Sequence, residues 1–273
     1  MMAPPQRCAM RDSGQDEHDR EQKKKLMSET NNNPQTRYAL YFAPEPDSPW
    51  WQAGCRWLGR DPALAQALPQ PAFDGVTVAE FQALTSDARR YGFHATLKAP
   101  FRLAEGSTAA QLDAALRAFC QHQHSLMIPA PRVEWMGNFL ALRPHGDVSA
   151  VNRLAMDCVS TFDRFRAPLS AADIARRQRH PLSERQMQLL QHWGYPYTDE
   201  EFRFHMTLTD ALHQSAHTDQ AEAIWQAAQN FFKIDAPLQL NGLALFTESA
   251  PGAPFQLVQR YAFGTANALP QAH

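Results

Sequence analysis

The sequence lacks several features that would mark a common class of protein. Only 12 of its 273 residues are glycine, and none belongs to a phosphate-binding loop or a dinucleotide fingerprint. The four cysteines form no CxxC pair, so their spacing suits neither a zinc site nor a small disulfide framework. No apolar run could span a bilayer, and the first residues lack a signal-peptide core. We therefore expect a protein of the reducing cytoplasm, with no membrane association and no cofactor.

Excess charge of either sign is also missing. The formal net charge is −2, with 44% apolar and 20% charged residues, which is ordinary for a globular protein. Without an overall positive field, the chain would not attract nucleic acid as a whole, so any phosphate must bind at a local site. The length allows one large domain or two small ones.

The two ends differ from the rest of the chain. Residues 1–36 are predicted to be a disordered extension, because residues 14–25 are almost all polar and Asn31 to Pro34 follow as a breaker. Met27, just before the fold, is a candidate alternative start, and the sequence leaves open whether translation begins at Met1 or at Met27. Residues 264–273 are expected to form a flexible tail, which leaves 37–263 as the folded part.

Periodicity in that folded part predicts both strands and helices. Strands are expected at residues 37–43, 91–101, 133–143 (bent, or a hairpin at Gly137 and Asn138), 201–209, 238–246 and 255–263. Helices are expected at residues 50–58, 78–88, 107–121, 149–165, 171–179, 183–193 and from 218 onward.

Two halves of this pattern resemble each other. Each runs through a strand with a His-x-Thr motif, a capped helix and a further strand. The expected caps are Ser107 or Thr108 in the first half and Thr218 in the second, and Ser107 and Thr218 each lie 13 positions after the histidine of their motif. The later strands contain the similar strings GNFLAL and NGLALF. This order predicts a pseudo-symmetric α+β fold, in which the two histidine strands lie side by side or face each other across a cleft.

Strand alternation separates each motif into an apolar and a polar face. His94, Thr96 and Lys98 share one face of the first motif, opposite Phe93, Ala95 and Leu97. The second motif has Arg203, His205, Thr207 and Thr209 on its polar face, opposite Phe202, Phe204, Met206 and Leu208.

Convergence of the two polar faces would assemble the groups that phosphate-ester chemistry needs. One imidazole takes a proton from water, the other gives a proton to the leaving oxygen, and hydroxyls and cations hold the remaining oxygens. No metal is required. A lone His-x-Thr is usually a surface pair, but here the longer string Phe-His-x-Thr-Leu occurs twice.

These paired strings resemble the signature of the two-histidine phosphoesterase superfamily, which includes RNA-ligase-like and tRNA-splicing cyclic phosphodiesterases. The strings RYALYFAP, YGFHATLKAPF and FRFHMTLT are most similar to an uncharacterised branch found with phosphonate-utilisation genes. The resemblance implies two pseudo-symmetric lobes, with antiparallel sheets and outer helices around a central cleft. The helical block at about 149–193 is an insertion expected to reshape one wall of that cleft.

The resemblance also implies an activity and its residues. His94 and His205 would be the acid/base pair, and Thr96 and Thr207 the phosphate ligands. The substrate would be a cyclic phosphodiester or related phosphoester of a small metabolite, such as a phosphoribosyl intermediate of phosphonate breakdown. Alternatives are a 2',3'-cyclic phosphodiesterase acting on RNA ends or nucleotides, and a non-catalytic module that binds a phosphate ligand. The sequence leaves the oligomeric state open.

Further residues could contact substrate, although each also fits a solvated or packed position. Possible substrate-binding residues are Tyr41, Lys98, Arg203, Tyr91 and Arg143. A basic cluster in the insertion is either a solvated helix face or a second anion contact, and comprises Arg176, Arg177, Arg179, His180 and Arg185. His122 and His124 are interpreted as a helix-end pair, because no partnering cysteine or acidic cluster has suitable spacing.

Overall fold

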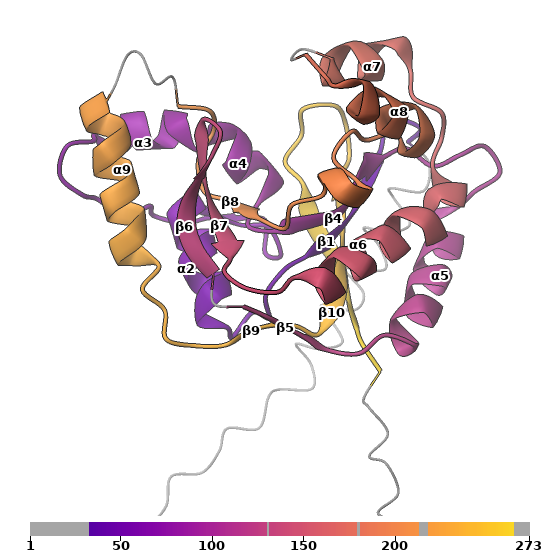
Figure 1. Cartoon of the computed structure of the whole chain (residues 1–273), viewed down its shortest axis with the longest axis horizontal. Coiled ribbons are helices and arrows are strands. Elements are labelled where there is room, and N and C mark those ends of the chain that lie inside the picture. Colours follow the sequence, from indigo (N-terminus) through magenta and orange to yellow (C-terminus); the bar gives the residue numbers. More distant parts are fainter. Residues whose placement is uncertain (1–32, 130, 179–180, 213–217, 265–273) are drawn as a thin grey trace, which may run out of the picture.

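A computed structural model of the chain describes residues 33–129, 131–178, 181–212 and 218–264 (Figure 1). Residues 1–32 of the predicted extension and 265–273 of the predicted tail lie outside the described residues. Residues 33–36 belong to the fold, since Asn33 donates a hydrogen bond to the carbonyl of Ser249 at 2.7 Å and Thr36 is buried. The folded part therefore begins slightly earlier than the sequence suggested.

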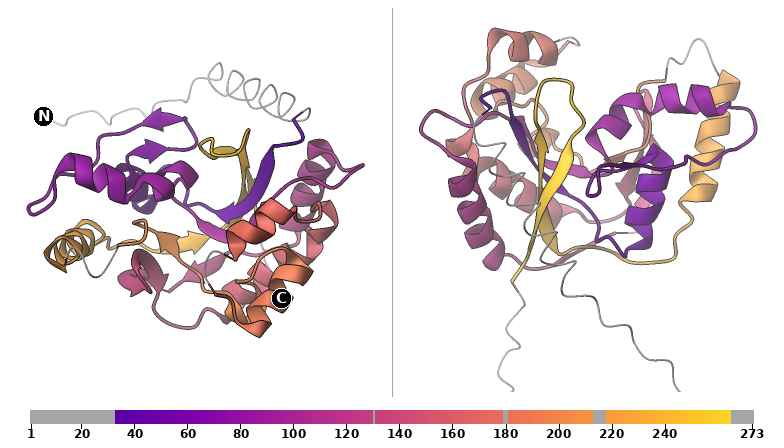
Figure 2. Two further views of the ribbon diagram at one scale, coloured as in Figure 1. Left: turned by 90° about the horizontal axis from the view of Figure 1, so that it is seen from above. Right: turned by 180° about the vertical axis from the view of Figure 1, so that it is seen from behind.

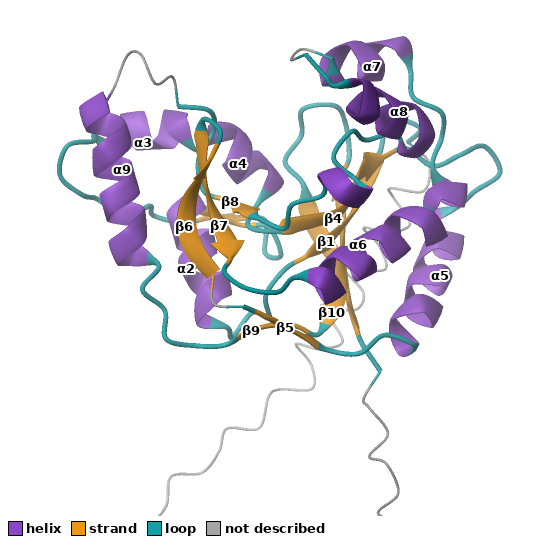
Figure 3. Ribbon diagram, in the orientation of Figure 1, coloured by secondary structure: helices purple, strands orange, loops and turns teal. Residues whose placement is uncertain are grey.

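A seven-stranded sheet, antiparallel at every pairing, forms the centre of the molecule (Figures 1 and 3). Its order is β11-β10-β1-β4-β8-β7-β6. Those strands are β11 (Gln256–Ala262), β10 (Gly242–Glu248), β1 (Arg37–Phe42), β4 (Ala95–Phe101), β8 (Met206–Thr207), β7 (Phe139–Pro144) and β6 (Pro131–Met136). Shorter pairs join β2 (Arg60–Asp61) to β3 (Gln66–Ala67) and β5 (Leu126–Ile128) to β9 (Leu238–Leu240). The predicted α+β class with antiparallel strands is confirmed.

The repeat seen in the sequence is visible in the order of elements. β4 is followed by α5 (Ala109–Gln121), β5 and the hairpin β6–β7, and β8 is followed by α9 (Thr218–Phe231), β9 and the hairpin β10–β11. The first hairpin pairs with β8, and the second reaches β4 through β1. Because each half's hairpin extends the sheet on the other half's side, the two motif strands meet in the middle of one continuous sheet.

The helices beside this sheet form two groups, at the left and at the right of the molecule in Figure 1 (Figures 1 and 2). One group is α2 (Pro49–Leu58), α3 (Val78–Leu84), α4 (Ser86–Tyr91) and α9, and the other is α5 and α6 (Ser149–Thr161). The rest of the insertion, with η1 (Asp163–Phe165), α7 (Ala171–Arg177) and α8 (Glu184–Trp193), stands above the end of β4 in Figure 1. The helix η2 (Asp199–Glu201) leads into the second motif.

Local sequence explains several of these boundaries. Thr108 accepts the backbone N–H of Gln111 and completes a capping box, so α5 begins at Ala109. The expected helix at 78–88 is divided in two, with Thr85 between α3 and α4. The insertion is fixed to the chain after β4, because Ala104 donates to Phe165 and Ala167 donates to Arg102 through backbone hydrogen bonds of 2.8 Å.

Both motif strands are shorter than predicted. Tyr91 ends α4, and Gly92 at φ +80° turns the chain before β4 starts at Ala95. In the second motif only Met206–Thr207 pair as a strand. Phe202 and Phe204 are nevertheless buried and Arg203 is exposed, so the predicted alternation continues through backbone that has no ladder partner.

Candidate active site

His94 occupies a tightly determined position just before β4. Its Nδ1 is 2.9 Å from the carbonyl oxygen of Gly92, and its Nε2 is 3.3 Å from the hydroxyl oxygen of Thr96. The ring stacks on Tyr41, with 3.7 Å between centroids and 22° between planes. A Cβ on Gly92 would lie 2.7 Å from Pro62, so glycine meets both the positive φ and the close approach needed here.

His205 repeats this arrangement on the neighbouring strand. Its Nδ1 lies 2.7 Å from the carbonyl oxygen of Arg203, again two residues earlier in the chain. The ring of Phe139 lies 5.8 Å away, at 52°. Since a carbonyl only accepts hydrogen bonds, both imidazoles carry their proton on Nδ1 when neutral, which leaves the lone pair on Nε2.

The sheet register brings the two motifs together. β4 and β8 are antiparallel neighbours with Ala95 opposite Met206. Moving one residue either way places His94 opposite Thr207 and Thr96 opposite His205, on the face away from Ala95 and Met206. All four side chains line one cavity of about 390 Å³. Each histidine thus has its own threonine two residues later and the other motif's threonine across the strand pair.

Burial makes both imidazoles poor proton acceptors in the free protein. It lowers the pKa of His94 to about 4, with a smaller lowering contribution from a charge on His205. The pKa of His205 is also lowered, mainly by burial and partly by the charge of Arg143. Both rings are therefore neutral near pH 7. A bound anionic phosphate would favour the protonated form and raise these pKa values again.

The possible substrate-binding residues differ in whether they line the cavity that contains the two histidines. Tyr41 and Tyr91 line the cavity with the histidines, although Tyr41 is only 1% exposed and acts as the platform under His94. Arg203 lines an adjoining cavity of about 370 Å³, which shares Thr96 and His205 with the first. Arg143 lines neither of these cavities and instead pairs with Glu134 at 3.0 Å.

Lys98 does not share the polar face with Thr96, and the alternation-based prediction is wrong at this residue. The β1–β4 register shifts between Leu40↔Lys98 and Tyr41↔Thr96, so an extra residue at Leu97 places Lys98 on the opposite face. Its ammonium group donates to the carbonyl of Val159 at 2.9 Å and pairs with Asp163 at 3.2 Å. Burial lowers the pKa of Lys98 to about 8.

The structure adds residues that the motif analysis missed. Arg37 on β1 lines the cavity, as do Arg176 and Arg177 from α7, two members of the predicted basic cluster. Extending the alternation of the first strand back from Tyr41 would have found Arg37. Asp210 also lines the cavity, but its carboxylate caps α4 by accepting the N–H groups of Asp87 and Ala88 at 2.8 Å.

No group of three or more His, Cys, Asp or Glu side chains that could hold a metal occurs within the described ranges. His122 lies at the end of α5, where its Nδ1 is 2.8 Å from the carbonyl oxygen of Ala118. In the part of the chain that the structure describes, no helix is both long and apolar enough to cross a bilayer.

Comparison with known proteins identifies the family. A family described as "Protein of unknown function (DUF1045)" matches residues 96–256, and the chain belongs to it. The chain is 48% identical over 231 residues to a ribose 1,5-bisphosphate phosphokinase PhnN of Janthinobacterium sp. (strain Marseille), covering 84% of this chain and 51% of that protein. Its counterpart in Laribacter hongkongensis (strain HLHK9) is 38% identical over 224 residues, covering 81% and 50%. The chain thus spans about half the length of these curated relatives.

Solved structures show weaker likeness. E. coli LigT complexed with 3'-AMP has 13% identity and a TM-score of 0.37, covering 85% of this chain and 99% of that one. A structure described as that of a phosphoesterase has 13% identity and a TM-score of 0.36, covering 84% and 99%. The family match and the two relatives therefore place the chain in the DUF1045 family, and the resemblance to two-histidine phosphoesterases rests on the paired His-x-Thr motifs.

Proposed function

We propose that the protein is a metal-independent phosphoesterase that hydrolyses a cyclic phosphodiester, or a related phosphoester, of a small metabolite. One observation carries this proposal. Two imidazoles, each with Nδ1 bound to a backbone carbonyl and a lone pair on Nε2, line the same cavity as two threonine hydroxyls. Since the two motifs are cross-strand neighbours, a phosphate between them would have one histidine on either side.

The arrangement supports acid–base hydrolysis. One neutral imidazole removes a proton from water through Nε2 while the water oxygen attacks phosphorus. The other imidazole, protonated because the phosphate anion raises its pKa, gives its proton to the ester oxygen as the P–O bond breaks. Thr96 and Thr207 donate their hydroxyl hydrogens to the non-bridging oxygens. One water is consumed, and a ring-opened phosphomonoester with a free hydroxyl is formed.

A phosphoribosyl substrate fits the size of the site and the names of the relatives. A cavity of about 390 Å³ is in the usual range for small-molecule sites. The relatives are named for a kinase of ribose 1,5-bisphosphate, but this chain spans half of them and contains no P-loop pattern. We therefore assign no kinase activity here. We place the substrate among phosphoribosyl cyclic phosphates, such as an intermediate of phosphonate breakdown.

Hydrolysis of RNA or nucleotide 2',3'-cyclic phosphates is the second candidate function. The observation that favours it is the aromatic lining of the adjoining cavity, where Phe139, Tyr195 and Tyr197 surround a space next to His205. Aromatic rings of this kind can stack nucleobases.

The test is turnover of ribose and nucleoside cyclic phosphates by the purified protein, with and without a chelator. We expect His94→Ala and His205→Ala each to lower kcat by about 10² to 10⁴-fold, the usual contribution of a general acid or base. His122 does not line the cavity, so His122→Ala is the matched control and should leave kcat unchanged.

Each competing interpretation predicts a different result. Full activity in both cavity variants would contradict the acid–base assignment, and saturable binding without product would establish the non-catalytic alternative. Loss of activity on chelation, restored by zinc, would contradict metal independence. We further propose that the predicted domain at 37–263, together with residues 33–36, forms the working unit. We also propose that it functions in the cytoplasm, since Cys55, Cys120 and Cys158 are free and buried.

A further inference from the structure

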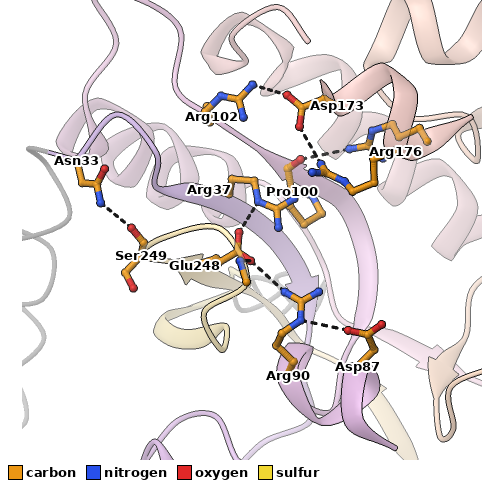
Figure 4. Close-up of polar contacts among 12 residues, drawn as sticks. Asn33, Arg37, Asp87, Arg90, Pro100, Arg102, Asp173, Arg176, Glu248 and Ser249 are labelled. Carbon is orange, nitrogen blue, oxygen red and sulfur yellow. Dashed lines mark hydrogen bonds and ion pairs between the residues drawn. The ribbon is translucent and has the colours of Figure 1, made fainter. Parts of the chain in front are cut away.

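Arginines gather on one side of the active-site cavity, where α7 comes close to β1 and β10 (Figure 4). Two carboxylates form ion pairs with four of these arginines. Glu248 pairs with Arg37 and with Arg90, the latter at 3.0 Å. Asp173 pairs with Arg102 and with Arg176, the latter at 2.8 Å. Both carboxylates are therefore already shared between two cations.

Arg177 is a fifth arginine in this group, and none of the carboxylates in the described ranges pairs with it. Its guanidinium lies 5.0 Å from the ring centroid of Tyr195. Its Nη2 is 3.5 Å from the carbonyl oxygen of Pro100, at the limit of a hydrogen bond. Its Nε is buried without a partner.

Such an arginine is costly unless an anion meets it. Removing a guanidinium from water is unfavourable when its N–H groups have no acceptors. Burial lowers the pKa of Arg177, and the charges of Arg176 and Arg37 add to this lowering, which Tyr195 and Asp173 offset only in part. The cavity's acidic residues, Asp87 and Asp210, lie together beside α4, and Figure 4 shows Asp87 next to Arg90 and away from Arg176.

We propose that Arg37, Arg176 and Arg177 form a second anion subsite, which binds a phosphate monoester on the same small molecule whose cyclic phosphate lies between the two histidines. This inference rests on the proposed function and narrows its substrate class to sugars with two phosphate groups. The three arginines line the same cavity as His94 and His205, so one ligand can reach both. A phosphate monoester suits them because its oxygens match the planar fork of N–H donors on arginine.

The first experiment compares substrates that differ only in this phosphate. Ribose 1,2-cyclic phosphate and adenosine 2',3'-cyclic phosphate are each assayed with and without a 5-phosphate (5' in the nucleoside). We expect the phosphorylated member of a pair to have a kcat/KM about 10 to 100-fold higher, the range for hydrogen bonds to a charged group.

Variants of Arg177 test whether this residue causes the preference for the phosphorylated substrate. Arg177→Met keeps a long apolar stem against Tyr195 and should abolish the preference for the phosphorylated member of each pair. Arg177→Lys retains the charge and should recover part of the preference. Arg153→Gln, an exposed arginine on α6, is the matched control for net charge and should keep the preference. A preference unaltered in Arg177→Met would overturn the proposal.

Binding separates failure of the subsite from failure of the proposed function. Ribose 5-phosphate is titrated calorimetrically into the His94→Ala/His205→Ala double variant, with and without Arg177→Met. We expect Arg177→Met to weaken binding at least tenfold whether or not the wild-type protein turns over any substrate. Equal affinities, in variants whose circular dichroism shows that they are folded, would refute the subsite even if cyclic phosphates are hydrolysed.

Discussion

The low pKa of His94 has a consequence for stability that can be measured without any substrate. Replacing His94 by Asn removes the titrating ring, while the Asn amide can still donate a hydrogen bond to the carbonyl of Gly92. The wild-type ring is neutral when folded because burial lowers its pKa to about 4, against an ordinary value of 6.5. In the unfolded chain the same ring protonates as soon as the pH falls below about 6.5.

Proton linkage gives the direction and the size of the effect of His94 on the free energy of unfolding. Between pH 6.5 and 4 the unfolded state binds more protons than the folded state, so stability falls as the pH is lowered through this window. Lowering the pH from 7 to 5 is expected to reduce the free energy of unfolding by about 2 kcal/mol through protonation of His94 in the unfolded chain, since one pKa unit corresponds to about 1.4 kcal/mol. Below the folded-state pKa the loss levels off at about 3 kcal/mol. Above pH 7 the ring contributes no pH dependence.

Urea unfolding of wild type and His94→Asn at pH 7 and pH 5 tests this reasoning. Other histidines and carboxylates contribute equally to both proteins, so the difference between their pH dependences isolates His94. We expect the wild type to lose about 2 kcal/mol more than the variant between the two pH values. Identical losses would refute a desolvated, neutral His94. An opposite sign would mean that the folded protein holds His94 in its charged form.

Two further substitutions test positions on either side of the motif. Lys98→Met should leave kcat/KM within about twofold, because Lys98 lies off the cavity. It should lower stability by less than the roughly 3 to 5 kcal/mol usual for loss of one partner of a buried ion pair, because Asp163 keeps Arg166 as a partner. A large loss of turnover, with unfolding by urea unchanged, would contradict this placement. Gly92→Ala should destabilise the protein by about 1 kcal/mol or more and lower kcat, because φ is +80° and a Cβ would approach Pro62 at 2.7 Å. A variant as stable and active as wild type would show that the turn at Gly92 does not fix the position of His94.

The grouping of the four motif side chains was predictable from the sequence because its signal is local. Alternation along two short strings placed His94 with Thr96 and His205 with Thr207, and the sheet brings these four side chains into one cavity. The second string keeps its alternation even where it lacks ladder partners, since packing against the core alone separates its two faces.

Other features depend on contacts between distant segments. The shifted register between β1 and β4 moves Lys98 to the opposite face, and a bulge of this kind leaves no mark in a count of alternating residues. The stacking of Tyr41 on His94 likewise needs β1 and β4 to be neighbours. Arg177 was one of several arginines in a basic run, and only the attachment of the insertion beside β4 brings it to the cavity.

Local sequence patterns therefore specify the α+β class, the internal repeat and the two His-x-Thr pairs, because side-chain alternation and helix capping act over a few residues. The tertiary structure alone decided that β4 and β8 are neighbours with Ala95 opposite Met206, so that each histidine faces the other motif's threonine. It also decided which cations reach the cavity. Those outcomes depend on strand pairing and on the burial of charges between segments far apart in the chain, which local patterns do not encode.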